Sequence, residues 1–256
     1  MPAGASTKKS ELQNHDALLQ VLGTEHGEHV GIYRPKTASV EKARENTTAK
    51  MLRLTPNLKR SSRVLILGSG FGGVARYLVD KYGSKVDCLN NDEEQNTFNQ
   101  GEVDRLEIQK KLIITQGPFN EIPYDRQTFD MVWCQDILLH GSRDRKVFKG
   151  IHRVLKDSGR FIFSGSFQSE DYPEEKMRPL LDTLPGNALI TADEYESIAG
   201  RAFLQKIYYS EMSEQLEHHY TAMLAQLEEK KKEVIAATSK SYFEETKAGY
   251  EAWVKA

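Results

Sequence analysis

Four closely spaced glycines follow an apolar run in the stretch RVLILGSGFGG, residues 63–73. Gly68, Gly70 and Gly73 satisfy the pattern G-x-G-x-x-G, and Gly72 adds a fourth glycine. Glycine lets the backbone turn sharply and lets a ligand approach it closely, so the stretch indicates a bound nucleotide cofactor. The glycines by themselves fit more than one cofactor, and tight packing without any ligand is the structural alternative.

The second apolar run bears on the kind of nucleotide. A dinucleotide would place its pyrophosphate on the next helix N-terminus and bond its ribose to an acid about twenty residues later. Here the run KVDCLN (85–90) ends in Asn90, not in Asp or Glu. Because an amide oxygen is a weaker acceptor than a carboxylate, the residues disfavour a dinucleotide without excluding it.

These residues lie in a regular alternation of apolar runs and helical patterns. Alternation of this length predicts an α/β fold with a doubly wound, mostly parallel sheet. In such a sheet the ligand binds beyond the carboxyl ends of the strands. The runs that we predict to be strands are 63–68, 85–90, 111–116, 129–135, 160–165 and 203–209.

The helices between the strands have their own signals. After the glycines, apolar residues recur at helical spacing up to Gly83, which suits a helix end. Ser142 can cap a helix that runs through Leu155, and DSG (157–159) should end it. Thr191 and Glu194 form a capping-box pattern before another helix.

The core has a polar, helix-prone segment on either side. We expect an N-terminal helical cap over 1–60, a cofactor-binding core over 61–212, and C-terminal helices over 213–256 that form a substrate lid. No internal repeat or low-complexity linker separates them, so we expect one integrated domain.

Composition narrows the classes of partner and compartment. The 35 basic and 37 acidic residues nearly cancel, which gives no reason to expect nucleic acid or an anionic membrane as partner. The N-terminus lacks the apolar stretch of a signal peptide, and no segment approaches transmembrane length. Cys88 and Cys134 lie in apolar runs, which suggests buried reduced thiols and a cytoplasmic protein. The histidines lack metal-ligand spacing, so no metal is expected.

The loops after the third and fourth runs distinguish the cofactors. The segment 117–123 reads G-x-x-x-x-I-P, and QDILLH follows the fourth run at 135–140. Here the chain resembles the class I S-adenosylmethionine-dependent methyltransferases. It is most similar to the glycine, sarcosine and dimethylglycine N-methyltransferases of betaine synthesis and to the related phosphoethanolamine enzymes. The segments in family order are HVGIY (29–33), LGSGFGGVARYL (67–78), CLNNDEEQN (88–96), WCQDILLH (133–140), RVLKDSGRFIFS (153–164) and EQLEHHY (214–220).

The resemblance implies S-adenosylmethionine as cofactor and assigns residues to it. Gly68, Ser69 and Gly70 would face its methionine part, and Asn90 would bind the ribose. Gln95 would lie near the ribose or adenine, Phe119 would flank the adenine, and Gln135 would border the methionine end. This cofactor has no pyrophosphate, so a neutral Asn90 is tolerable.

The chain also departs from the family pattern. The usual acid two residues before the first glycine is Ile66, and the usual arginine before the first core strand aligns with Asn46, with Arg44 nearby. The family closes with a final apolar strand, whereas this sequence stops at YEAWVKA. Without that strand one sheet edge is open, and we expect the 213–256 helices or a second copy, in a homodimer, to cover it.

Methyl transfer to an amine needs alignment and a neutral nucleophile. His140, in the loop after the fourth run, is our candidate proton acceptor, and the matching histidine of the phosphoethanolamine enzymes belongs to their catalytic site. A structural role is the alternative for this histidine. A betaine-type acceptor also needs donors for its carboxylate and aromatic faces for its cation. The available side chains are Tyr33, Arg44, Trp133, His219 and Tyr220, for whose aromatics core packing is the alternative.

The sequence therefore predicts an S-adenosylmethionine-dependent methyltransferase that acts on a small amine or zwitterion, in the first place sarcosine or dimethylglycine. One alternative is another small acceptor, such as a methylthio acid, a phosphoethanolamine-type amine or a natural product. The other is a non-catalytic cofactor-binding subunit, which Ile66, Asn46 and the missing strand suggest.

Overall fold

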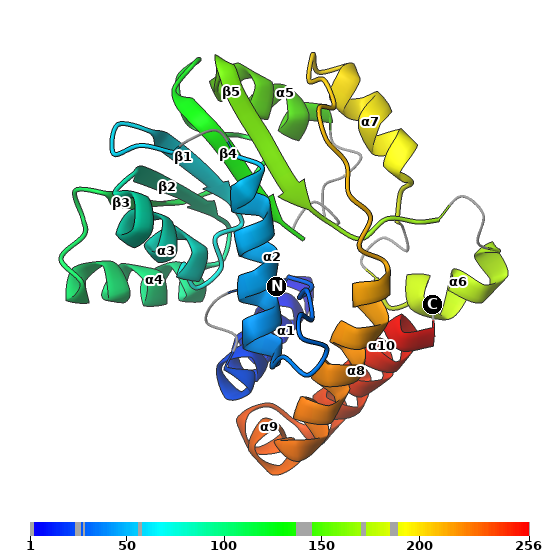
Figure 1. Ribbon diagram of the computed structural model, residues 1–256. Helices are drawn as coiled ribbons and strands as arrows, with labels where there is room; N and C mark the ends of the chain where they lie inside the picture. Colours follow the sequence, from blue (N-terminus) through cyan, green and yellow to red (C-terminus); the bar gives the residue numbers. More distant parts are fainter. Residues whose placement is uncertain are drawn as a thin grey trace.

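The structure is a computed structural model of the chain and describes residues 3–23, 27, 29–55, 58–136, 145–169, 173–184 and 189–255. Strands and helices alternate through its central part, except that a loop without a helix joins the third and fourth strands (Figure 1). The strands are β1 (Arg63–Leu67), β2 (Lys85–Asn90), β3 (Leu112–Gln116), β4 (Phe129–Gln135) and β5 (Leu155–Ser164). The helices are α1 (Ala3–Leu22), α2 (Val40–Arg53), α3 (Gly73–Tyr82), α4 (Glu93–Arg105), α5 (Arg145–Val154), α6 (Glu174–Leu181), α7 (Ala192–Gly200), α8 (Glu214–Glu229), α9 (Lys231–Ala237) and α10 (Lys240–Lys255).

The five strands form one parallel sheet in the order β3-β2-β1-β4-β5. The chain winds outward from β1 to β3, then returns to the centre and winds the other way through β4 and β5. The carboxyl ends of β1 and β4 therefore flank the point where the winding reverses, which is the expected ligand position in a doubly wound sheet. The predicted fold class is confirmed.

Alternate side chains of β1 enter two different cores, as strand geometry requires. Val64 and Ile66 pack with α2, α3 and α4 on one face, whereas Leu65 and Leu67 pack with α5 and α7 on the other. Figure 1 shows these helices as layers on either side of the sheet. Burial on both faces explains why β1 reads as a continuous apolar run.

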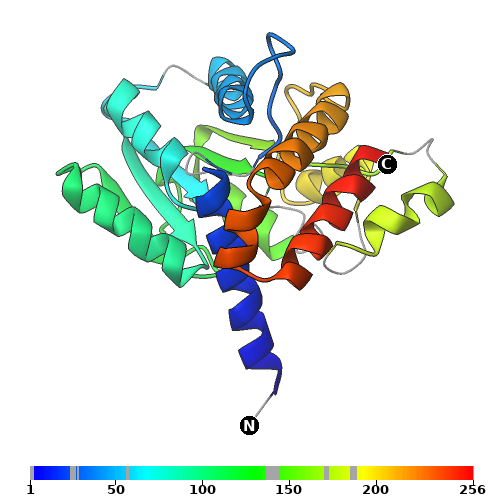
Figure 2. The ribbon, with the colours of Figure 1, turned by 90° about the horizontal axis from the view of Figure 1, so that it is seen from below.

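The N- and C-terminal helices pack together beside the sheet. Leu18 and Leu22 of α1 share a buried cluster with Met223, Leu227 and Phe243 of the C-terminal helices. Figure 2 shows the C-terminal half of α1 beside α9, the described element with which it makes more contacts than with any other. Segments from opposite ends of the chain thus form one helical layer.

Several predicted local signals are confirmed. Gly83 ends α3 with a left-handed conformation, and its N–H donates to the carbonyl of Val79 at 2.9 Å. Thr191 and Glu194 form both hydrogen bonds of the capping box before α7. Cys88 and Cys134 are buried, and the structure shows no disulfide at either described cysteine. The predicted cap Ser142 lies outside the described residues.

Two predictions about the strands were wrong. The helix expected to run through Leu155 ends at Val154, and β5 begins at once; residues 156–159 are absorbed by a shift in the β4–β5 register. The run 203–209 forms no strand. Phe203 has a positive φ of 63° and is 82% exposed, and Tyr208 and Tyr209 are also exposed. A segment of strand-like composition forms a strand only if one face is buried and a neighbouring strand is hydrogen-bonded to it, and this segment has neither.

The edge of β5 has no strand partner among the residues that the structure describes. The C-terminal helices, which we expected at this edge, pack chiefly against one another and against α1, α2 and α6. None of the described helices is long and apolar enough to cross a membrane.

Candidate functional site

The glycine loop lies at the carboxyl end of β1 and is built from left-handed residues. Gly68, Gly70 and Gly72 have φ angles of 69°, 53° and 82°. Gly68 N–H donates to the carbonyl of Leu89 at 2.9 Å, which fixes the loop to β2. A Cβ at Gly72 would lie 1.9 Å from the side-chain oxygen of Asn99, whereas one at Gly70 would meet no protein atom within 4 Å. Gly72 is therefore required by packing, and Gly70 borders open space.

Ser69, between these glycines, has a buried hydroxyl for which the described part of the chain supplies no geometrically acceptable hydrogen bond. The hydroxyl lies beside the thiol of Cys88, and burial raises the pKa of that thiol to about 12. The neighbouring Ile66 is buried in the core, so no acid reaches the loop from β1. A buried polar atom without a partner beside an open backbone suits a polar ligand.

The tip of β2 carries a chain of amide and carboxylate groups. Asn90 Nδ2 donates to Gln95 Oε1 at 3.2 Å, and Gln95 Nε2 donates to Asp16 Oδ1 at 2.8 Å. Asp92 caps α4 by accepting from the N–H of Gln95 at 2.9 Å. The predicted pair Asn90 and Gln95 is thus brought together. Asp16 was not predicted, because a single acid in a polar helix carries no local signal.

The side chains at the end of β4 connect the sheet to α2. Trp133 Nε1 donates to Gln135 Oε1 at 2.8 Å, and Gln135 Nε2 donates to Thr48 Oγ1 at 3.4 Å. Thr48 Oγ1 in turn lies 3.4 Å from His29 Nε2, and that nitrogen is 3.0 Å from the carbonyl of Arg44. Gln135 therefore reaches the site, while Trp133 is a core residue that supports it.

The segment 29–34 crosses from α2 to α8. Asn46 Nδ2 donates to the carbonyls of Ile32 and Arg34 at 2.9 and 3.0 Å, and Asp136 Oδ2 accepts from Val30 N–H at 2.7 Å. Asn46 thus anchors this segment.

Tyr33 and His219 meet at the inner side of this segment. Tyr33 Oη is 3.1 Å from His219 Nδ1, which also accepts from the N–H of Gly31 at 3.3 Å. Because an amide N–H can only donate, Nδ1 is an acceptor and the ring proton belongs on Nε2. Burial, with the nearby charge of Arg44 and His29, lowers the pKa of His219 to about 3, and burial raises the pKa of Tyr33 to about 12. Both groups are therefore neutral at physiological pH.

Arg44 and Tyr220 flank this pair. Arg44 is buried, and its guanidinium donates to the carbonyl of His29 at 3.2 Å and lies 3.7 Å from the sulfur of Met223. The ring of Tyr220 stacks on Trp253 at 4.9 Å between centroids and lies 5.4 Å from the ring of His219. Tyr33, Arg44, His219 and Tyr220 thus gather where residues 29–33, α2 and α8 meet.

Two predicted residues stand apart from these groups. Phe119, in the loop after β3, is partly buried against the core on the α5 side of the sheet. His140 lies outside the described residues. No group of three or more potential metal ligands occurs within the described ranges.

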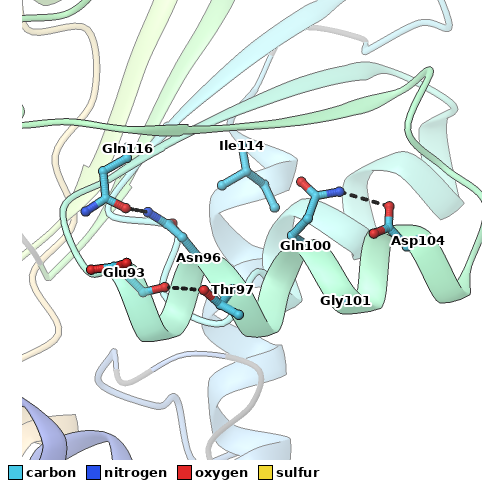
Figure 3. Close-up of a pocket in the computed structure, with 8 residues that line it drawn as sticks. All are labelled: Glu93, Asn96, Thr97, Gln100, Gly101, Asp104, Ile114 and Gln116. Carbon is cyan, nitrogen blue, oxygen red and sulfur yellow. Dashed lines mark hydrogen bonds between the residues drawn. The ribbon is translucent and has the colours of Figure 1, made fainter.

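A surface groove of about 500 Å³ lies elsewhere, between α4 and the β3 edge (Figure 3). It is lined mainly by one side of α4, and the side chains in it pair with one another, as Gln100 does with Asp104 at 2.9 Å. The groove meets the candidate site at Gln116, which pairs with Asn90 in the sheet, and at Asn96, which donates to Gln116 at 2.9 Å and to the carbonyl of Asn90 at 3.1 Å. It lacks the glycine loop, so we do not place the cofactor in it.

Comparisons with known proteins agree with this geometry. A family model described as a methyltransferase domain matches residues 65–163. The sarcosine/dimethylglycine N-methyltransferase of Aphanothece halophytica is 30% identical over 228 residues, which cover 89% of this chain and 82% of that relative. The enzyme of the same name from Halorhodospira halochloris is 31% identical and covers 88% and 81%. A crystal structure from Galdieria sulphuraria, described as a candidate sarcosine dimethylglycine methyltransferase, superimposes with a TM-score of 0.83 at 28% identity and covers 93% and 92%.

Proposed function

Since the chain belongs to the family of sarcosine/dimethylglycine N-methyltransferases, we propose that it methylates the nitrogen of sarcosine or dimethylglycine towards betaine. Its methyl donor is S-adenosylmethionine. The observation that carries the proposal is the glycine loop, where Gly70 borders open space beside the buried hydroxyl of Ser69, at the carboxyl end of β1.

The residues around this loop suit the cofactor. Gly68, Ser69 and Gly70 would hold its methionine part, which needs close backbone approach more than an anion site. Asn90 and Gln95 present amide groups at the tip of β2 for the ribose. Phe119 would flank the adenine, and Gln135 would border the methionine end from β4.

When bound, S-adenosylmethionine supplies a methyl group that is already attached to a sulfonium leaving group. The protein's remaining task is to align the acceptor and to let it lose its ammonium proton, because only a neutral amine attacks. We assign proton acceptance to His140. His219 is unsuited to that task, since a pKa of about 3 makes it too weak a base.

The neutral Tyr33–His219 pair suits an acceptor that becomes a permanent cation. A neutral phenol and imidazole do not repel the growing positive charge, and the ring of Tyr220 beside them offers an aromatic face. Arg44 would attract the carboxylate of the acceptor. Trp133 would act through Gln135, because its own side chain is buried.

The assembly and location are part of the same proposal. We place the protein in the cytoplasm, as one integrated domain, with a second copy covering the open edge of β5 in a homodimer. Light scattering that gave the mass of a monomer at micromolar concentration would contradict the dimer. Independent unfolding of residues 1–60 or 213–256 would contradict the single domain.

Binding and turnover together test the function. S-adenosylhomocysteine should raise the melting temperature, and NADH should not. Release of S-adenosylhomocysteine from S-adenosylmethionine should then depend on the added acceptor, with sarcosine and dimethylglycine faster than phosphoethanolamine or a methylthio acid. A faster reaction with phosphoethanolamine or a methylthio acid would identify that compound as the acceptor in place of sarcosine and dimethylglycine. Binding of S-adenosylhomocysteine without any turnover would favour a non-catalytic subunit.

A further inference from the structure

Asp16 of α1 has one carboxylate oxygen in use and one without a partner. Its Oδ1 accepts from Gln95 Nε2 at 2.8 Å, whereas its Oδ2 is buried and has no hydrogen bond from any described residue. The residue as a whole is 3% exposed. Native proteins rarely leave a buried carboxylate oxygen without a hydrogen bond. Burial removes the strong hydrogen bonds that this oxygen makes with water in the unfolded chain, and nothing replaces them.

The position of Asp16 is set by packing and does not depend on Gln95 alone. Leu18 and Leu22, which follow Asp16 on α1, are buried among the C-terminal helices. The carbonyls at the end of α1 accept from Gln226 Nε2 at 2.7 Å and from Lys230 Nζ at 2.6 Å. Contacts with α8 and α9 therefore fix the position of α1, and the fixed helix keeps the Asp16 carboxylate at the tip of β2.

The tip of β2 needs such a carboxylate. A ribose presents two hydroxyl donors, and nucleotide sites of doubly wound sheets bond them to an acid at this tip. Here the tip is Asn90, whose Nδ2 is engaged with Gln95. A carboxylate accepts a hydroxyl proton more strongly than an amide oxygen does.

We propose that Asp16 is a cofactor-binding residue whose free Oδ2 accepts a hydrogen bond from a ribose hydroxyl of S-adenosylmethionine. The acid that β2 lacks is supplied by the N-terminal helix. The inference rests on the proposed function, since it names a contact within the same cofactor site.

The electrostatic surroundings agree with this assignment. Burial raises the pKa of Asp16 above its usual range, and the carboxylates of Asp92 and Glu94 add to this, while the hydrogen bond from Gln95 and the charge of His15 act the other way. Burial thus makes the ionised form of this carboxyl costly, and a hydroxyl donor would relieve part of that cost.

The test is calorimetric binding of S-adenosylhomocysteine and of its 2′-deoxy and 3′-deoxy ribose analogues. The wild type should bind one deoxy analogue about 10- to 100-fold more weakly than the parent, the range expected for a hydrogen bond to a charged acceptor. Asp16→Asn should bind S-adenosylhomocysteine more weakly than the wild type does, by a similar factor. It should also bind S-adenosylhomocysteine and that deoxy analogue with equal affinity. Asn keeps the shape and the acceptor for Gln95, so its melting temperature without ligand should be equal to or higher than that of the wild type.

Gln13→Ala is the matched control. Gln13 lies one turn before Asp16 and donates to Glu94 of α4 at 3.2 Å, but it is exposed. This variant should keep the wild-type discrimination between the analogues. If Asp16→Asn still discriminates between S-adenosylhomocysteine and the deoxy analogue, or lowers the melting temperature without changing affinity, then Asp16 only attaches α1 to α4 through Gln95. If the wild type binds S-adenosylhomocysteine in no condition, the proposed function itself fails.

Discussion

Substituting Gly70 by alanine separates cofactor binding from folding. A Cβ at this position meets no protein atom within 4 Å, so the only cost to the folded chain is its left-handed φ of 53°. For a residue with a Cβ that conformation costs about 1–2 kcal/mol. In a domain of this size each kcal/mol lowers the melting temperature by roughly 2–4 °C. We therefore expect Gly70→Ala to fold and to melt only a few degrees below the wild type.

The same methyl group would occupy space that the methionine part of the cofactor needs. Inserting one methyl into a close-packed contact costs about 1–3 kcal/mol, which corresponds to an affinity loss of about 5- to 150-fold. Calorimetric titration with S-adenosylhomocysteine measures this loss, and differential scanning fluorimetry without ligand measures the folding cost.

Two other glycines serve as controls. Gly72→Ala should fail to fold or melt far lower, because its Cβ would lie 1.9 Å from Asn99. Gly101→Ala, in the groove of Figure 3, meets nothing within 4 Å and should leave affinity unchanged while stabilising α4. If Gly70→Ala binds S-adenosylhomocysteine within twofold of the wild type, the cofactor does not lie against the glycine loop.

Three further predictions concern other residues. The pKa of His219 is about 3 in the folded chain and 6.5 as a free group. As the pH falls below 6.5, His219 therefore binds a proton in the unfolded chain but not in the folded chain. The free energy of unfolding should therefore fall by up to about 1.4 kcal/mol per pH unit, and His219→Gln should have a shallower slope between pH 6.5 and 5 in urea titrations; an equal slope would contradict the neutral, buried imidazole. His140→Ala should lower turnover by roughly a hundredfold with cofactor affinity unchanged, and unaltered turnover would remove it from the mechanism. Asp87 is buried and bonds the Arg63 guanidinium at 2.7 and 2.8 Å, so Asp87→Ala should reduce the free energy of unfolding by about 1–3 kcal/mol; a midpoint equal to that of the wild type would show that the pair adds nothing.

The sequence predicted those parts of the molecule whose signals are local. β1, β2 and β4 are short runs buried on both faces, β3 and β5 at the sheet edges are partly exposed, and Thr191 with Glu194 forms a cap within four residues. The run 203–209 has a similar strand-like composition but no neighbouring strand. The composition of a segment does not show whether another strand lies beside it. Local pattern therefore identified the sheet but overcounted its strands.

The site shows the same limit more strongly. Gly70 and Asn90 lie near each other because consecutive parallel strands precede or end at them, but their roles toward the cofactor were taken from the family resemblance and stay predictions. The contact between Tyr33 and His219 spans 186 residues and depends on how α8 packs against segment 29–33. Asp16 reaches Gln95 across 79 residues for the same reason. No spacing within either segment encodes such a contact.

The most direct test of the account is transfer of a labelled methyl group. The protein is incubated with S-adenosylmethionine carrying a trideuterated methyl and with sarcosine or dimethylglycine, and the products are identified by mass spectrometry. Sarcosine should give trideuterated dimethylglycine, dimethylglycine should give trideuterated betaine, and one S-adenosylhomocysteine should form for each methyl group transferred. Binding of S-adenosylhomocysteine with no label on either amine, under conditions where an added related enzyme transfers it, would contradict the account.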